Sequence, residues 1–178
     1  MEIELFRPVE ILPRSLNVLV APESVAADAL GELLMQRRCL FLYVCGNYSR
    51  LLSALSLRTG DFEIRRAFTA AQLLTIIREA HQTFVFIEHD PNLFAESEEL
   101  LGYALMALKE LSKESAVTIY SPFMDGSLRS ISSVADRVFL LADLSGGKPP
   151  TGRPGGFGRR GKRPEHPARG SQSTLEVF

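Results

Sequence analysis

The sequence predicts an α/β fold in which a mostly parallel β-sheet is covered by helices on both faces. Short apolar runs, rich in β-branched and aromatic residues, alternate along the chain with longer segments of helical periodicity. Strands that are apolar on both faces are typical of parallel sheets buried between two helical layers. Apolar residues make up 46% of the 178 residues, which suits one core of this kind. We therefore expect a single three-layer domain over residues 1–144.

Five apolar runs are predicted to be the buried strands of this sheet. Each is short, apolar and rich in β-branched or aromatic residues, as buried strands of a parallel sheet commonly are. The predicted strands are 16–21, 39–45, 84–87, 116–120 and 137–141.

Three of the segments between these strands are predicted to be helices. Ser24 is placed to cap the first, in which apolar residues recur at helical spacing. Thr69 and Gln72 form a capping-box pair at the start of the second. The third, 96–112, carries leucine and alanine along one side and is predicted to be a long amphipathic helix.

Residues 145–171 have the composition of a disordered linker. The stretch 145–170 contains eight glycines, five prolines and one aromatic residue, too little apolar surface to offset the entropy of ordering. From residue 145 onward the chain carries a net charge of +5, which leaves −6 for residues 1–144. Basic flexible segments bind phosphates without sequence preference, although a solvated, solubilising linker is the alternative interpretation. The candidate nucleic-acid contacts are Arg153, Arg159, Arg160, Lys162 and Arg163.

The last seven residues form a recognisable short motif. Gln172 is followed three positions later by Leu175 and three positions after that by Phe178. This spacing resembles the PCNA-interacting peptide, although the second aromatic residue of that pattern would fall beyond Phe178. One tight helical turn places the leucine and the phenylalanine on one face. The resemblance implies that these two side chains fill the hydrophobic pocket of the sliding clamp, while Gln172 hydrogen-bonds beside it. The alternative is an ordinary chain end without a partner.

The body of the chain carries a second resemblance. Its residues are the segment 64–74 that leads into a helix, the strand 84–87, Tyr120-Ser121-Pro122, and the segment 135–141. Together they resemble the RecA-like ATPase family, in particular archaeal RadA and its paralogues. The resemblance implies a P-loop NTPase core and an archaeal source.

The nucleotide chemistry of that family is missing from the sequence. The residues after strand 16–21 contain neither the glycines nor the lysine that cradle phosphates. Pro22 removes an amide donor, and Glu23 would repel a phosphate at the helix start. Glu88 stands where the resemblance implies the aspartate that holds magnesium. We therefore expect an inactive ATPase homologue without a nucleotide or metal cofactor.

The sequence leaves three functions open. The preferred one is a non-catalytic DNA replication, repair or recombination accessory that binds PCNA, with DNA and a recombinase or polymerase as further partners. The second is a divergent ATPase or a metal-dependent nuclease that uses Glu88 and Asp90. His89, Asp125 and Asp136 are further candidates for its metal site. In the alternative, structural interpretation these residues are capping groups, and Asp90 starts a turn. The third is a structural subunit of a recombinase-paralogue complex.

Membrane and export signals are not recognisable in the sequence. The first residues lack the positive region and long apolar region of a signal peptide, and no apolar run approaches the length of a membrane span. We expect a cytoplasmic protein without a membrane partner.

Overall fold

The central element of the fold is a six-stranded parallel sheet. The computed structural model describes residues 3–6, 9–36, 39–55, 62–94 and 97–141. The strands lie side by side in the order β5-β4-β6-β7-β3-β8, and all neighbouring pairs are parallel. Their bounds are β3 (Ser15–Val20), β4 (Phe41–Cys45), β5 (Phe62–Arg66), β6 (Phe84–Glu88), β7 (Ala116–Ser121) and β8 (Arg137–Leu140). The predicted α/β class with a mostly parallel sheet is confirmed.

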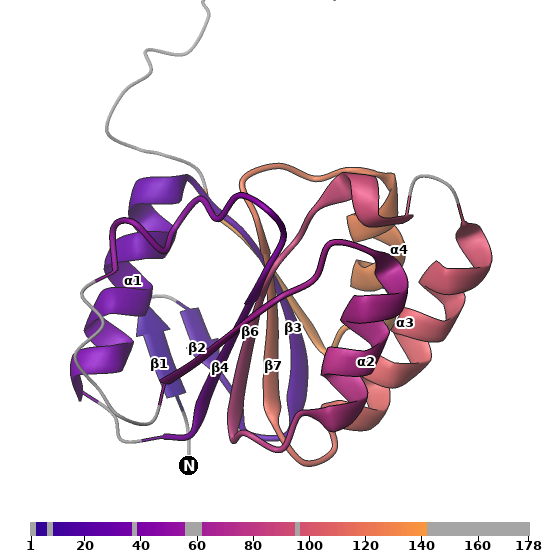
Figure 1. The fold of residues 1–178 in the computed structure, drawn as a ribbon. Coiled ribbons are helices and arrows are strands. Elements are labelled where there is room, and N and C mark those ends of the chain that lie inside the picture. The colour runs from indigo at the N-terminus through magenta and orange to yellow at the C-terminus, as the bar shows by residue number, and fades with distance from the viewer. Residues whose placement is uncertain (1–2, 7–8, 37–38, 56–61, 95–96, 142–178) are drawn as a thin grey trace, which may run out of the picture. The chain divides into compact units, whose positions relative to one another are not determined.

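Helices cover both faces of the sheet. The helix α1 (Glu23–Gln36) lies on one face together with an antiparallel hairpin of β1 (Ile3–Phe6) and β2 (Val9–Ile11). The other face carries α2 (Ala70–Glu79), α3 (Glu98–Leu111) and α4 (Gly126–Val134), with a 3₁₀ turn, η1 (Pro91–Phe94). Figure 1 shows these elements as three layers.

The helix starts follow the predicted capping chemistry in one case out of two. The Thr69 hydroxyl accepts a hydrogen bond from the Gln72 amide at 3.2 Å, which confirms Thr69 as the N-cap of α2. The Gln72 side chain accepts from the Phe68 amide at 2.8 Å, one residue before the N-cap amide that a capping box uses. Ser24 is not the cap of α1, because that helix already includes Glu23. Pro22 stands immediately before it.

Two apolar clusters fill the space between the layers. The cluster on the α1 side is rich in aromatic residues, and the rings of Phe41, Tyr43, Phe84, Phe86 and Tyr120 pack across neighbouring strands. The cluster on the other face is mainly aliphatic and joins the sheet to α2, α3 and α4. The central strands β4, β6 and β7 are buried throughout, which accounts for their largely apolar sequence; the exceptions are Glu88, Thr118 and Ser121.

The strand order separates elements that follow one another in the chain. β3 lies between β7 and β8, and β4, the next strand in the sequence, is reached only across β7 and β6. This order differs from the dinucleotide-binding and flavodoxin-like orders, in which the first strand lies beside the second. The carboxyl ends of β3, β7, β6 and β4 consequently form one continuous edge.

Three elements were not predicted from the sequence. They are the hairpin β1–β2, the edge strand β5 and the short helix α4. The linker 145–171 and the peptide 172–178 lie outside the described residues. Within the described part of the chain, no helix has the length and apolar character needed to cross a membrane.

Candidate functional site at the carboxyl edge of the sheet

The connection between β3 and α1 occupies the place where a phosphate-binding loop would lie. β3 ends at Val20 and α1 begins at Glu23, so only Ala21 and Pro22 connect them. The Ala21 amide donates to the Ser121 carbonyl at 3.2 Å, and the Pro22 carbonyl accepts from the Ala26 amide at 3.0 Å. A P-loop needs a longer glycine-rich segment whose free amides surround the phosphates. This two-residue junction is instead bound to β7 and to the helix.

A carboxylate stands at the N-terminus of α1. The Glu23 Oε1 atom lies 2.9 Å from the Arg50 guanidinium, and both side chains are about half exposed. A negative side chain in the first turn is favourable for the helix, and it takes the position that an anionic ligand would otherwise prefer. The ion pair itself contributes little to stability because it is exposed. The Glu23 carboxylate would repel a phosphate at this helix end, although the Arg50 guanidinium offsets its charge.

Glu88, the last residue of β6, is a buried structural acceptor. Its side chain accepts hydrogen bonds from the Tyr43 hydroxyl at 2.5 Å and the Ser49 hydroxyl at 3.0 Å. The backbone amides of Arg50 and Leu51 donate to it at 3.1 and 2.9 Å. Glu88 is only 6% exposed, so its carboxylate faces the loop after β4 rather than solvent. The same carboxylate adds to burial in raising the pKa of Tyr43 above its ordinary value.

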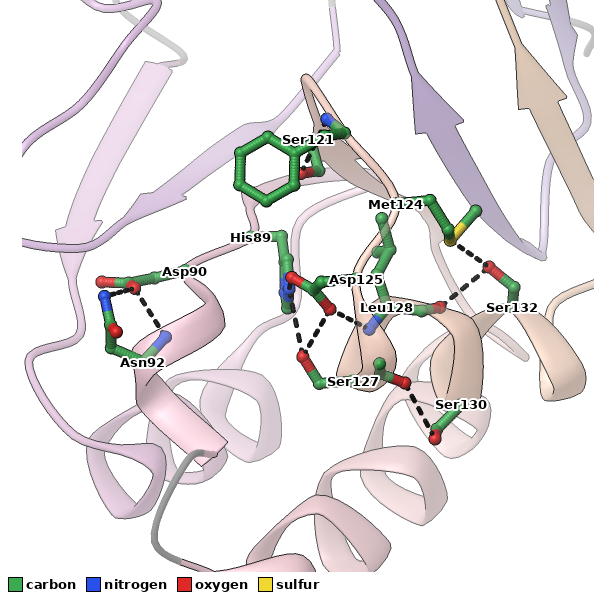
Figure 2. Close-up of polar contacts among 12 residues, drawn as sticks. His89, Asp90, Asn92, Ser121, Met124, Asp125, Ser127, Leu128, Ser130 and Ser132 are labelled. Atoms are coloured by element: carbon green, nitrogen blue, oxygen red, sulfur yellow. Dashed lines mark hydrogen bonds and ion pairs between the residues drawn. The ribbon is translucent and has the colours of Figure 1, made fainter. Parts of the chain in front are cut away.

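His89 and Asp125 join the end of β6 to the start of α4. The His89 Nε2 atom lies 2.7 Å from Asp125 Oδ2, and the imidazole is almost completely buried. The other carboxylate oxygen of Asp125 accepts from the Leu128 amide and from the Ser127 hydroxyl, each at 2.8 Å, which makes Asp125 the N-cap of α4. Figure 2 shows the three polar side chains of His89, Asp125 and Ser127 converging.

This cluster does not have the arrangement of a nucleophilic triad. The Ser127 hydroxyl lies 3.2 Å from Nε2 of His89, the same nitrogen that contacts Asp125. In a triad the acid and the nucleophile use different nitrogens of the histidine, so that the acid orients the ring while the second nitrogen removes a proton. Burial raises the pKa of Asp125, but the hydrogen bonds from Leu128, Ser127 and His89 outweigh it and lower that pKa overall. The cluster therefore has a structural role: Asp125 caps α4, and its contact with His89 joins that helix to the end of β6.

Asp90 starts a turn, as its structural interpretation predicted. Its Oδ1 atom accepts from the backbone amide of Asn92 at 2.9 Å and from the Asn92 side chain at 3.0 Å. The Asp90 carbonyl accepts from the Leu93 amide at 3.2 Å, which begins η1. A Cβ atom at Gly46 would approach Asp90 Oδ2 to 3.0 Å, so the loop after β4 passes close to this carboxylate.

Asp136 does not join the other acidic residues. It lies immediately before β8, at the amino ends of the strands rather than at their carboxyl ends. There its Oδ2 atom accepts a hydrogen bond from the Leu16 amide at 2.8 Å. Its Oδ1 atom lies 2.5 Å from the Lys109 ammonium group. The alternative in which Asp136 joins Glu88, His89, Asp90 and Asp125 in a metal site is not supported, because Asp136 precedes its strand while Glu88 ends one. In the part of the chain that the structure describes, no group of three or more His, Cys, Asp or Glu side chains is arranged to hold a metal ion.

Comparison with known proteins places the chain in a family. No protein-family model matches it. It is 33% identical over 132 residues to an uncharacterized protein of Archaeoglobus fulgidus, a match that covers 74% of this chain and 67% of that protein. The chain belongs to the family of this archaeal protein. The matched length approaches that of the α/β body.

The sequence-predicted contacts for clamp and nucleic acid lie outside the described residues. They are Gln172, Leu175 and Phe178 for the clamp, and Arg153, Arg159, Arg160, Lys162 and Arg163 for nucleic acid. Sequence reasoning missed the donors that surround Glu88. The available signal was the polar run Asn47-Tyr48-Ser49-Arg50, which follows a buried strand after one glycine. A loop at this place meets the carboxyl ends of the neighbouring parallel strands.

Proposed function

We propose that this protein is a non-catalytic, RecA-like accessory of DNA replication, repair or recombination that binds the PCNA sliding clamp through residues 172–178. The observation that carries the proposal is the spacing of Gln172, Leu175 and Phe178 at the end of a basic, glycine-rich segment. An apolar pair that follows such a segment has no role in a core of its own, whereas it suits a peptide that docks into another protein.

The α/β body supports the RecA-like part of the proposal. It is a parallel sheet between two helical layers, and its strand order differs from the dinucleotide-binding and flavodoxin-like alternatives. Most of the segment 64–74, which carries part of the family resemblance, lies in β5 and in the first half of α2, the helix that Thr69 caps. The similarity to an archaeal protein agrees with the proposed archaeal type.

The carboxyl edge of the sheet supports an adaptor rather than an enzyme. The β3–α1 junction has two residues, and Glu23 supplies negative charge where a nucleotide phosphate would bind. Glu88, which the nuclease and ATPase alternatives need as a metal ligand, is engaged by donors of its own chain. The chemistry of this edge thus favours fold maintenance over phosphoryl transfer.

The linker gives the clamp peptide a mechanical role. A flexible chain of about 26 residues, which is what the composition of 145–170 predicts, spans roughly 25 to 30 Å root-mean-square and would tether the body to the clamp without fixing its orientation. Tethering raises the effective concentration of the body, and of any partner it carries, at DNA that the clamp encircles. The arginines and lysines of the linker add contacts to phosphates that do not depend on sequence.

Calorimetric titration of the full chain with the sliding clamp of its own organism tests the proposal. Replacing Leu175 and Phe178 together by alanine removes both apolar anchors, and we expect a loss of several kcal/mol that abolishes measurable binding. The matched control replaces Ser173 and Glu176, two variable positions of the motif, by alanine and should keep the affinity within a few-fold. Equal affinity of the two double variants would refute clamp binding through this peptide.

A further inference from the structure

An apolar groove lies between α2 and α3, on the face of the sheet opposite α1. Its volume is about 540 Å³. The two helices pack side by side in Figure 1. The apolar residues that line the groove are Ile77, Ala80, Tyr103, Met106, Ala107 and Leu111. Ile77 and Leu111 belong to the aliphatic core, so the floor of the groove is continuous with the interior.

Two large side chains on α3 border the groove and remain open to solvent. Met106 is 63% exposed and Tyr103 is 43% exposed, and they lie one helical turn apart. The Tyr103 hydroxyl donates to Glu99 Oε1 at 3.0 Å, which holds the ring on this side of the helix. A methionine is flexible enough to adapt to an incoming apolar side chain. Adjoining exposed apolar residues of this size are characteristic of interaction sites.

The charged rim of the groove favours a positive group. The charged residues that line the groove are Glu110 and Glu114 from the α3 side and Arg78 from the end of α2, and Lys113 offsets the charge of Glu110. α2 and α3 run in the same direction and both end here, so the negative ends of two helix dipoles also point to this place. Lys113 forms an ion pair with Glu110, but within the described residues Glu114 has no such cation. A lysine or arginine of a ligand would complete this end of the groove.

We propose that the α2–α3 groove binds an amphipathic helix of a partner protein. The helix inserts two apolar side chains, three or four positions apart, against Met106 and Tyr103, and it places a lysine or arginine beside Glu114. Helices commonly bind in grooves between helices by such paired anchors. The groove would give the proposed adaptor a second binding surface besides the clamp peptide. The inference rests on the proposed function only in this respect.

Selection from a randomised library of helical peptides, displayed against the full chain, tests the proposal. We expect the enriched peptides to share two apolar positions with that spacing and a basic residue near one end. Met106→Asp should weaken their binding at least tenfold, and Glu114→Lys should weaken it at least fivefold at low salt. The matched controls are Met35→Asp and Glu32→Lys on α1, which make the same changes at exposed positions of the opposite layer and should leave the affinity unchanged.

Other occupants of the groove give different results. If residues 172–178 of the chain itself filled it, the variant with Leu175 and Phe178 replaced by alanine would bind the selected peptides more tightly. If a second copy filled it, the full chain would sediment as a dimer that Met106→Asp dissociates. Either result would overturn the proposal, as would enriched peptides that bind the groove variants and the controls equally. Because the peptide assay contains no clamp, its failure is distinguishable from failure of clamp binding.

Discussion

Replacing Glu88 by glutamine tests whether the carboxyl edge of the sheet is structural. The substitution keeps the size of the side chain and removes its negative charge. Glu88 accepts from two hydroxyls, those of Tyr43 and Ser49, and from the backbone amides of Arg50 and Leu51. The glutamine carbonyl can still accept some of these bonds, while its amide group would oppose the remaining donors.

The expected cost follows from the difference between charged and neutral hydrogen bonds. A bond to a charged acceptor contributes about 1.5 to 3 kcal/mol, and a neutral one about 0.5 to 1.5 kcal/mol. Four donors that share one carboxylate do not add independently, so we expect Glu88→Gln to lower the free energy of unfolding by about 3 kcal/mol. For a domain of this size the melting temperature should fall by roughly 10 °C.

Calorimetric melting of both proteins, with and without Mg²⁺ or Mn²⁺, distinguishes a structural Glu88 from a metal ligand. We expect a large decrease in melting temperature that neither cation changes. Glu32→Gln, an exposed glutamate on α1, is the control and should alter stability by less than about 0.5 kcal/mol. A decrease below about 1 kcal/mol would contradict the structural role. A cation that stabilises the wild type but not the variant, or DNA cleavage that the variant loses, would support the nuclease alternative.

Two further predictions concern titrating groups. Asp125→Ala should lower the free energy of unfolding by about 2 kcal/mol at neutral pH, because it removes the N-cap of α4 and the partner of His89. Since the folded-state pKa of Asp125 is lowered, its contribution to stability is complete above the unfolded pKa of about 3.9 and is lost as the pH falls through the folded pKa. Urea unfolding should therefore show a smaller difference in stability between the wild type and Asp125→Ala near pH 3 than at neutral pH. Equal differences at the two pH values would refute this linkage. Burial, with Glu23 and Glu88 nearby, raises the pKa of Tyr120 to about 12, so its contribution to stability is complete below about pH 10 and is lost as the pH rises through 12. Tyr120→Phe should remove an ionisation step near pH 12 from the ultraviolet tyrosine titration. Loss of a step near pH 10 instead would show that Tyr120 ionises as an exposed tyrosine does.

The buried strands could be predicted because burial on both faces restricts them to mainly apolar residues. β4, β6 and β7 are covered on both faces, so nearly every position carries an apolar side chain, apart from Glu88, Thr118 and Ser121. β5 lies at the edge of the sheet, where none of its residues is fully buried, and the charged residues Glu63, Arg65 and Arg66 interrupt its apolar pattern. α4 was missed because it buries only Leu128 and Ile131 among several serines.

For the acidic residues, position in the chain predicts the edge of the sheet at which each lies but not its hydrogen-bond partners. Glu88 ends β6, and its place at the carboxyl edge followed from the strand assignment. Its role did not, because the donors that surround it come from β4 and the loop that follows, almost forty residues earlier. Asp136 was grouped with Glu88 by residue type alone, although it precedes β8 and lies at the other edge. Convergence of side chains depends on strand direction as well as on chemistry.

Clamp binding by the whole chain and by residues 1–171 alone is the most direct measurement. Both proteins retain the α/β body and the linker, so only the terminal heptapeptide differs between them. Sedimentation velocity of each with the clamp should give a complex for the whole chain and two separate species for the shortened one. A complex that persists without the heptapeptide would contradict the account.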